Sequence, residues 1–285
     1  MSAQKVRCGR ISFTNDLPVY AAFDLEALAF PGTLREGVPT QLNRALLDGE
    51  LDMSPVSSFY YAQHRAQLTL LPFVCIGSRR EVRSIYCISA VAPRELEGVR
   101  IAVTRDSSTG RALFDTICRE AYGFEAKYYE STDPFESYRR KGDPCLVIGD
   151  MAIDAALAVP PEHAHDVGRL WYELTGAGMV YAVWAARNKF ADKRPGDVAQ
   201  VMTALRDSVR WSESHRQQVI GLAERVRPRP AGFYDAYYRA LNYDFDDEAR
   251  KGMMRFFALA ATRGVLDVKS QLGEPQPARK VIRYA

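Results

Sequence analysis

The sequence has little that would carry a chain into or across a membrane. No stretch approaches the roughly 18 consecutive apolar residues of a membrane span. The opening segment, MSAQKVRCGRISF, lacks a long apolar run followed by a small-residue cleavage site. The cysteines are odd in number, show no close pairing and stand mostly among apolar neighbours: Cys8, Cys75, Cys87, Cys118 and Cys145. We therefore expect reduced, buried thiols in a cytoplasmic protein that has no contact with a membrane.

The signatures of several common chemistries are also missing. There is no GxSxG elbow, no GxxxxGK(S/T) phosphate loop and no GxGxxG after the first strand, which argues against triad hydrolysis, ATP use and hydride transfer. The four histidines show neither HExxH nor a cysteine–histidine spacing. We accordingly expect no metal and no cofactor.

Charge of one sign is scarce as well. The formal net charge is only +3 and the basic residues are scattered, so nucleic acid is not an expected partner, whereas a small anionic ligand is compatible with this balance. With 285 residues, 47% of them hydrophobic and 26% charged, the chain is longer than one hydrophobic core usually spans. Two domains are the first expectation, and the sequence leaves the oligomeric state open.

What is present is a repeated succession of strand, polar loop and helix. An opening strand runs into SFTNDLPVY (12–20), and the helix of PTQLNRALLDG (39–49) precedes a short strand ending at Pro55. Ser57 or Ser58 can cap the next helix, FYYAQHRA. Further units join a strand over 99–103 to a helix ending at Gly123, and a strand over 145–148 to an Ala-rich helix. This alternation predicts an α/β protein with parallel sheets covered by helices on both faces.

Two further apolar strands divide the chain. We interpret SIYCISA (84–90) and MVYAVWAAR (179–187) as crossings between two lobes, which predicts lobe I from residues 1–90 and 179–285 and lobe II from residues 91–178. The last third reads as mainly helical, and its aromatic-rich PAGFYDAYYRALNY (230–243) should pack against lobe I. A ligand cleft then lies between the lobes, with hinge motion expected at the crossings.

Polar loops at the ends of the strands should line that cleft, because ligands of open α/β sheets bind at the carboxyl ends of strands. Asn15 is our candidate catalytic residue, since an amide can orient a hydroxyl or a carboxylate without carrying charge. The candidate substrate-binding residues come from three loops and from the start of the first crossing strand: Ser57, Ser84, Ser107, Ser108, Thr109, Gly149 and Asp150. Free N–H groups at a helix start suit a carboxylate or phosphate.

These polar residues also have a plainer interpretation. Ser107 to Thr109 could simply cap the helix that follows them, because serine and threonine are preferred caps. For Asp150 capping is the favoured role, since its carboxylate would repel an anionic ligand held close by. Only the expected convergence of all these loops on one cleft raises the binding interpretation above this one.

The order and spacing of five segments resemble the chorismate dehydratases of the futalosine route to menaquinone, a family with the type II periplasmic-binding-protein fold. The segments are SFTNDLPVY, PTQLNRALLDGELDMSPVSSFYYA, IGSRREVRSIYCIS, IAVTRDSSTGRALF and VIGDMAI, which together cover roughly the first 155 residues. The sequence departs from the family at Gly110, where a second hydroxyl residue is expected after the threonine.

The resemblance implies loss of water from chorismate to give 3-[(1-carboxyvinyl)oxy]benzoate. The substrate would be a small dicarboxylate, Asn15 would orient the departing hydroxyl or the reacting edge, and Ser107, Ser108 and Thr109 would bind a carboxylate. No general base stands out in the motifs, and the substrate's own enolpyruvyl carboxylate could serve.

Three other interpretations stay open. The sister family, 1,4-dihydroxy-6-naphthoate synthase, shares the fold but should carry Cys-Pro-Asn-Asp where this chain has Phe-Thr-Asn-Asp. A non-catalytic solute-binding protein would bind a small anion without reacting, and it would normally carry a signal peptide. An effector-binding regulatory domain would need an attached DNA-binding segment, for which we find no room.

Overall fold

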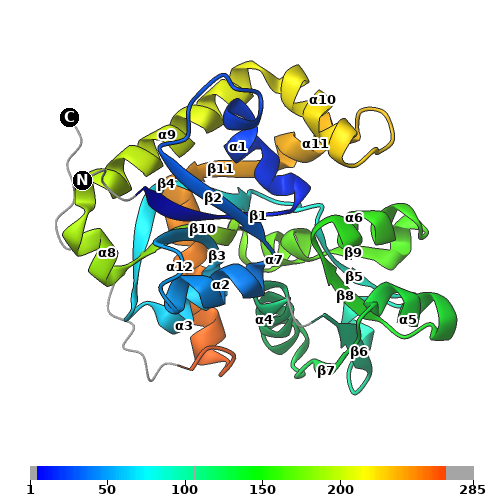
Figure 1. Cartoon of the computed structure of the whole chain (residues 1–285). Coiled ribbons are helices and arrows are strands. Elements are labelled where there is room, and N and C mark those ends of the chain that lie inside the picture. The colour runs from blue at the N-terminus through cyan, green and yellow to red at the C-terminus, as the bar shows by residue number, and fades with distance from the viewer. Residues whose placement is uncertain (1–4, 105–106, 268–285) are drawn as a thin grey trace.

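The protein folds around two mixed sheets, which define two lobes in a computed structural model that describes residues 5–104 and 107–267. We call residues 5–78 and 179–267 the larger lobe and residues 85–175 the smaller lobe. In Figure 1 the smaller lobe is the teal and green part at the lower right, and the larger lobe contains the blue elements, the yellow-green and yellow helices α8 to α10, and the orange elements. The two chain ends of the described structure thus lie in the same lobe.

The larger lobe has a six-stranded sheet in the order β11-β4-β10-β3-β1-β2. Its strands are β1 (Val6–Ile11), β2 (Gly32–Gly37), β3 (Met53–Ser57), β4 (Leu68–Ser78), β10 (Met179–Arg187) and β11 (Leu241–Phe245). Its helices are η1 (Thr14–Asp16), α1 (Leu17–Asp24), α2 (Pro39–Leu47), α3 (Ser58–His64), α8 (Asn188–Lys193), α9 (Pro195–Ser214), α10 (Arg216–Val226), α11 (Phe233–Ala240) and α12 (Asp247–Thr262).

The smaller lobe has a five-stranded sheet in the order β7-β6-β8-β5-β9. Its strands are β5 (Ile85–Ile88), β6 (Arg100–Val103), β7 (Lys127–Glu130), β8 (Cys145–Ile148) and β9 (Ala164–Asp166). Its helices are η2 (Pro93–Glu95), α4 (Ser108–Ile117), the π-helical η3 (Cys118–Tyr122), α5 (Pro134–Lys141), α6 (Gly149–Leu157), η4 (Pro161–His163) and α7 (Val167–Thr175).

The expectation of wholly parallel sheets is wrong. Strand β1 pairs in parallel with β2 and β3, and β6 pairs in parallel with β7 and β8. Strand β10, however, runs antiparallel between β3 and β4, and β5 runs antiparallel between β8 and β9. Strand β11 also pairs antiparallel with β4. Strands β5 and β10 are the first strands after the two crossings, and there the chain enters the new sheet without the helical crossover that parallel pairing requires.

The first crossing lies earlier in the chain than residue 90. Since β5 pairs within the smaller sheet, the chain leaves the larger lobe after Ser78 and crosses over residues 79–84. Asp166 anchors this segment, because its carboxylate accepts hydrogen bonds from the N–H groups of Val82 (3.1 Å) and Arg83 (2.7 Å) and also caps α7. Arg83 has a left-handed backbone, with φ of 56°. Residues 176–178 make the return crossing to β10.

The hydrophobic core is continuous between the lobes. Trp171 on α7 and Phe256 on α12 are both fully buried and meet edge to face, with 6.0 Å between their ring centres. Helix α12 also packs on α4, where Arg263 bonds to Glu120 of η3 at 2.5 Å. In Figure 1 α12 is the orange helix that passes behind β3 towards α3. Among the described residues, no helix combines the length and apolar character needed to span a membrane.

Candidate active site

Asn15 is held at the boundary of the lobes by its neighbours' backbone contacts. Thr14, one residue earlier in η1, donates from its N–H (3.1 Å) and its Oγ1 (2.6 Å) to the two carboxylate oxygens of Asp150 on α6. From the other side, the hydroxyls of Tyr238 and Tyr243 donate to the carbonyl oxygens of Thr14 and Asn15, each at 3.0 Å. Asn15 is half-buried, and its side-chain amide makes no hydrogen bond to a described residue. The backbone around it is therefore anchored, while the amide remains available to a ligand.

The starts of α3 and α4 form a second contact between the lobes. Ser57 caps α3, since its Oγ accepts from the N–H of Tyr60 at 3.2 Å, and the same Oγ lies 3.3 Å from Oγ of Ser108 on α4. The N–H of Phe59 donates to Oγ1 of Thr109 at 3.3 Å. Two helix N-termini, one from each lobe, therefore face each other through hydroxyl groups.

Ser107 stands at the N-cap position of α4 but does not cap it. Its side chain makes no capping hydrogen bond, the residue is only 2% exposed, and its Oγ has no partner among the described residues. A buried hydroxyl without a partner costs about 1 to 3 kcal/mol. For the side chain of Ser107 the capping interpretation is therefore wrong, and a ligand oxygen would satisfy this hydroxyl.

Gly110 gives Ser107 the room that it occupies. A Cβ at position 110 would lie 3.1 Å from Ser107 Oγ and 3.1 Å from Cγ2 of Ile148, the last residue of β8. The missing hydroxyl at this position is thus a consequence of close packing between α4 and β8. The same packing places the start of α4 beside the start of α6, which follows Ile148 directly.

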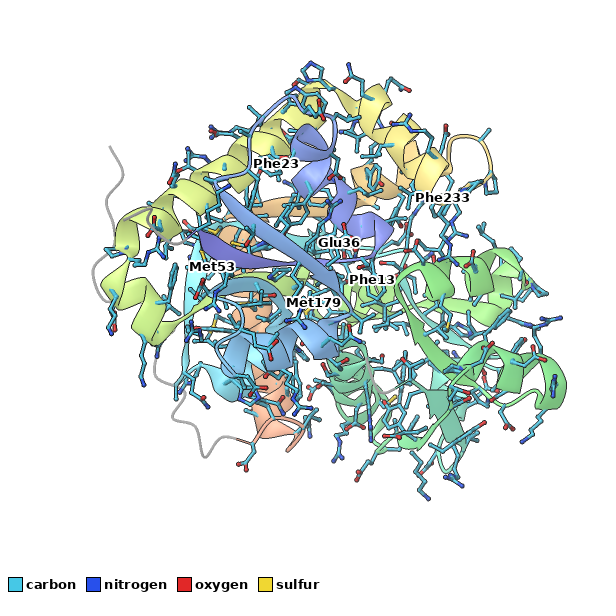
Figure 2. The ribbon with its side chains drawn as sticks, in the orientation of Figure 1. Phe13, Phe23, Glu36, Met53, Met179 and Phe233 are labelled. Carbon is cyan, nitrogen blue, oxygen red and sulfur yellow. The ribbon has the colours of Figure 1, made fainter. Side chains whose placement is uncertain are left out.

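Gly149 and Ser84 fix the start of α6. The N–H of Gly149 donates to the carbonyl of Ser84 at 2.8 Å, while the buried Ser84 hydroxyl donates to the carbonyl of Val82 at 3.3 Å. Gly149 has φ of +63°, and a Cβ here would come within 3.2 Å of the Phe13 ring. Phe13, labelled in Figure 2, lies between the blue end of β1 and the green smaller lobe. Both residues contribute backbone geometry to the site, and the hydroxyl of Ser84 is already engaged.

Asp150 has protein donors on both carboxylate oxygens. Besides Thr14, the guanidinium of Arg229 approaches Oδ1 at 3.5 Å, donates to the Asp150 carbonyl at 3.2 Å and bonds to Asp154 one turn further along α6. The side chains of Arg229 and Asp150 are only 5% and 9% exposed. We found no signal for Arg229 in the sequence, since it stands alone between two prolines.

The neighbouring Asp16 has an unusual titration. Burial raises the pKa of its carboxyl to about 7, and the nearby Arg10 guanidinium and the Ile11 N–H only partly oppose this. The residue is 1% exposed, its Oδ2 accepts from Ile11 N–H at 3.1 Å, and its Oδ1 has no partner among the described residues. Acidic groups therefore stand at the starts of α1 and α6, whereas the residues that the structure describes at the starts of α3 and α4, Ser57 and Ser107 to Thr109, bear neutral hydroxyls.

This division favours an anion between α3 and α4. A helix N-terminus carries roughly half a positive charge, which an adjacent carboxylate offsets. The eight predicted site residues all lie along the lobe boundary, with Ser57, Ser107, Ser108 and Thr109 in one group and Asn15, Ser84, Gly149 and Asp150 in the other. Over residues 5–104 and 107–267, no group of three or more His, Cys, Asp or Glu side chains is arranged to hold a metal ion.

The arrangement of the lobes defines the class of protein. A protein of Archaeoglobus fulgidus superposes with a TM-score of 0.70 at 15% identity, covering 93% of this chain and all of its own. The periplasmic aliphatic sulphonate binding protein of Escherichia coli superposes with a TM-score of 0.66 at 14% identity, over 93% of this chain and 94% of its own. The fold is that of the periplasmic binding proteins, as expected from the sequence.

Within that class, the chain belongs to the menaquinone biosynthesis family, whose family model matches residues 6–262. The chorismate dehydratase of Thermus thermophilus is 30% identical over 260 residues, which span 86% of this chain and 91% of the relative. The match extends through the C-terminal third, well beyond the first 155 residues on which the sequence resemblance depends.

Proposed function

We propose that this protein is a chorismate dehydratase, a carbon–oxygen lyase that removes water from chorismate to give 3-[(1-carboxyvinyl)oxy]benzoate. Family membership and the Thermus thermophilus relative support this reaction. The observation that carries the proposal is the pairing of the starts of α3 and α4 through neutral hydroxyls, with the Ser107 hydroxyl buried and unpartnered among the described residues.

The chemistry fits a site made of neutral donors. The hydrogen to be removed is acidified through the ring diene by the ring carboxylate, and the product is aromatic, so the reaction is downhill once the proton has left. The enzyme's work is then to hold two carboxylates, to stabilise charge that builds up on the ring carboxylate, and to exclude water. Oriented hydroxyl and N–H groups do this without neutralising the substrate's own base.

Roles for the residues follow from this arrangement. Ser107, Ser108 and the N–H groups at the start of α4 bind one carboxylate, with Ser57 completing the pair of facing hydroxyls. The Asn15 amide orients the departing ring hydroxyl. The enolpyruvyl carboxylate of the substrate removes the proton. We place this reaction in the cytoplasm, which agrees with five cysteines that are all buried and free.

The decisive experiment is incubation of the purified protein with chorismate. The aromatic product is followed by ultraviolet absorbance and identified by mass. Asn15→Ala should lose at least about 100-fold in kcat, as expected for loss of a hydrogen bond that acts in the transition state, while chorismate binding measured by calorimetry stays within about threefold. Asn188→Ala, which removes an amide at the start of α8, is the matched control and should keep full turnover.

The alternatives give different results in the same experiment. A binding protein would bind chorismate and return it unchanged. A 1,4-dihydroxy-6-naphthoate synthase would leave chorismate untouched. Full turnover by Asn15→Ala would leave the dehydratase reaction standing and remove the role given to Asn15.

A further inference from the structure

Helix α6 carries two carboxylates that join the lobes. Asp150 and Asp154 lie one turn apart, and both bond to Arg229 in the segment between α10 and α11. Asp154 is 42% exposed on its side chain and also bonds to Arg227. Only Asp150 reaches further, to Thr14 of η1. The two residues therefore share a partner but differ in their access to the Asn15 loop.

The bonds between Asp150 and Thr14 are short and buried. A hydroxyl donating at 2.6 Å to a carboxylate is a charge-assisted hydrogen bond, which is about twice as strong as a neutral one. It crosses from the smaller lobe to the larger lobe, so any separation of the lobes at this point breaks it. The two tyrosine hydroxyls that bind the other side of η1 both come from the larger lobe, at Tyr238 and Tyr243.

From this geometry we infer that Asp150 is a positioning residue that couples closure of the lobes to the placement of Asn15. In the closed protein its carboxylate clamps Thr14 against the tyrosine hydroxyls, and the adjacent Asn15 amide is then fixed. In an opened protein η1 keeps only the contacts within its own lobe. This inference rests on the proposed function for its kinetic consequence, and it differs from a role for Asp150 as a substrate ligand.

The charges explain how an acidic group can hold this position. A free carboxylate beside a dianionic substrate would oppose binding, and Asp150 is compensated by a guanidinium that is itself 5% exposed. Arg229 thus supplies the counter-charge, and each oxygen of the Asp150 carboxylate already accepts a hydrogen bond from Thr14.

The test compares Asp150→Asn with Asp154→Asn, which has the same change of charge on the same helix. For Asp150→Asn we expect kcat to fall about 10- to 100-fold, the ratio for loss of a charge-assisted hydrogen bond, with KM within about threefold of the unmodified protein. Asp154→Asn should change either constant by less than about threefold. Thr14→Val should lower kcat as much as Asp150→Asn does, whereas Thr14→Ser, which keeps the hydroxyl, should have the kcat of the unmodified protein. Combining Thr14→Val with Asp150→Asn should lower kcat little further than either change alone.

A readout without turnover separates this inference from the proposed function. The chain has only four asparagines, so ¹⁵N-asparagine labelling gives few side-chain amide signals, and the Asn15 signal is assigned by its absence in Asn15→Ala. In the protein without substrate, Asp150→Asn should shift or broaden this signal and Asp154→Asn should not. Asp150→Asn and Asp154→Asn each add one new asparagine signal, so the two spectra contain the same number of signals and can be compared directly.

Each result bears on one claim. If the unmodified protein does not dehydrate chorismate but the Asn15 signal responds to Asp150→Asn alone, the reaction is wrong and the coupling stands. Equal kinetic effects of the two variants, or a raised KM with kcat unchanged, would overturn the coupling in an active enzyme. If the Asn15 signal is unchanged in Asp150→Asn, and thermal unfolding shows that this variant is folded, the coupling is wrong whether or not the protein dehydrates chorismate.

Discussion

Asp16→Asn tests whether the carboxyl beside Asn15 costs stability near neutral pH. The pKa of Asp16 rises from 3.8 to about 7 because the group is buried, so the folded protein holds a proton that the unfolded chain releases. A folded pKa above the unfolded one means that stability is highest below pH 3.8 and declines as the pH rises to about 7. Above that pH the whole cost of burying the charge is present.

The size of the effect follows from the same two values. The difference is about three pH units, each worth about 1.4 kcal/mol. Relative to its value below pH 3.8, the free energy of unfolding therefore falls by about 2 kcal/mol at pH 5, where the folded protein keeps the proton, and by about 4 kcal/mol at pH 8, where the buried group is ionised. Asn has no such dependence, and its side-chain oxygen can still accept from the Ile11 N–H. The free energy of unfolding of the variant minus that of the unmodified protein should therefore grow by about 2 to 3 kcal/mol as the pH rises from 5 to 8.

Urea unfolding at pH 5, 6, 7 and 8, followed by circular dichroism and extrapolated to water, measures this gain. Asp192→Asn on α8 is the control, because it removes the same charge from an exposed position and should show no growing difference. Parallel curves for Asp16→Asn and the unmodified protein across this range would show that the Asp16 carboxyl ionises normally in the folded protein, which would refute the reasoning from burial.

Three further substitutions test the packing that positions the site, each by its free energy of unfolding in urea. Gly252→Ala would drive a Cβ to within 2.3 Å of a backbone carbonyl in the second crossing and should cost about 1 to 3 kcal/mol. Gly221→Ala on α10 would meet only the Arg225 guanidinium, at an ordinary contact distance of 3.7 Å, and should stabilise by up to about 1 kcal/mol. Gly149→Ala forces a left-handed alanine against the Phe13 ring, so we expect a cost of about 1 to 2 kcal/mol and a lower kcat. Asp52→Ala leaves two arginines without their shared carboxylate and should cost about 3 kcal/mol.

The elements that were predictable from the sequence are those with a strong local pattern. Helix α2 has its apolar residues on one face, and strand β8 is a short apolar run ended by a glycine, so both were expected within a few residues. Strand β11 was not, because its five residues follow an aromatic-rich helix with no turn signal between them, and their alternating burial is too short to stand out. Its place in the sheet depends on pairing with β4, more than 160 residues away.

The site was predictable in part for the same reason. Ser57 and Ser107 to Thr109 stand at strand-to-helix turns, which a local pattern marks as helix starts. Their partners across the lobes carry no such mark, since nothing in the sequence near Arg229 or Tyr243 indicates that they meet residues 150 and 15. For Ser107 the local pattern misleads. Its position just before a helix predicts a capping side chain, but in the structure the Ser107 hydroxyl makes no capping hydrogen bond.

A dianion in the proposed site would be attracted by helix starts that bear neutral hydroxyls. Two of the described carboxylates at the lobe boundary, Asp150 and Asp16, are held in ways that limit their repulsion. Asp150 is paired with Arg229, and burial favours the neutral form of Asp16 up to about pH 7. Either carboxylate, if free and ionised, would weaken the binding of a substrate with two negative charges. In the proposed site, Asp150 and Asp16 therefore act on the backbone around Asn15, and the described side chains proposed to bind the anion, Ser57 and Ser107 to Thr109, carry no charge.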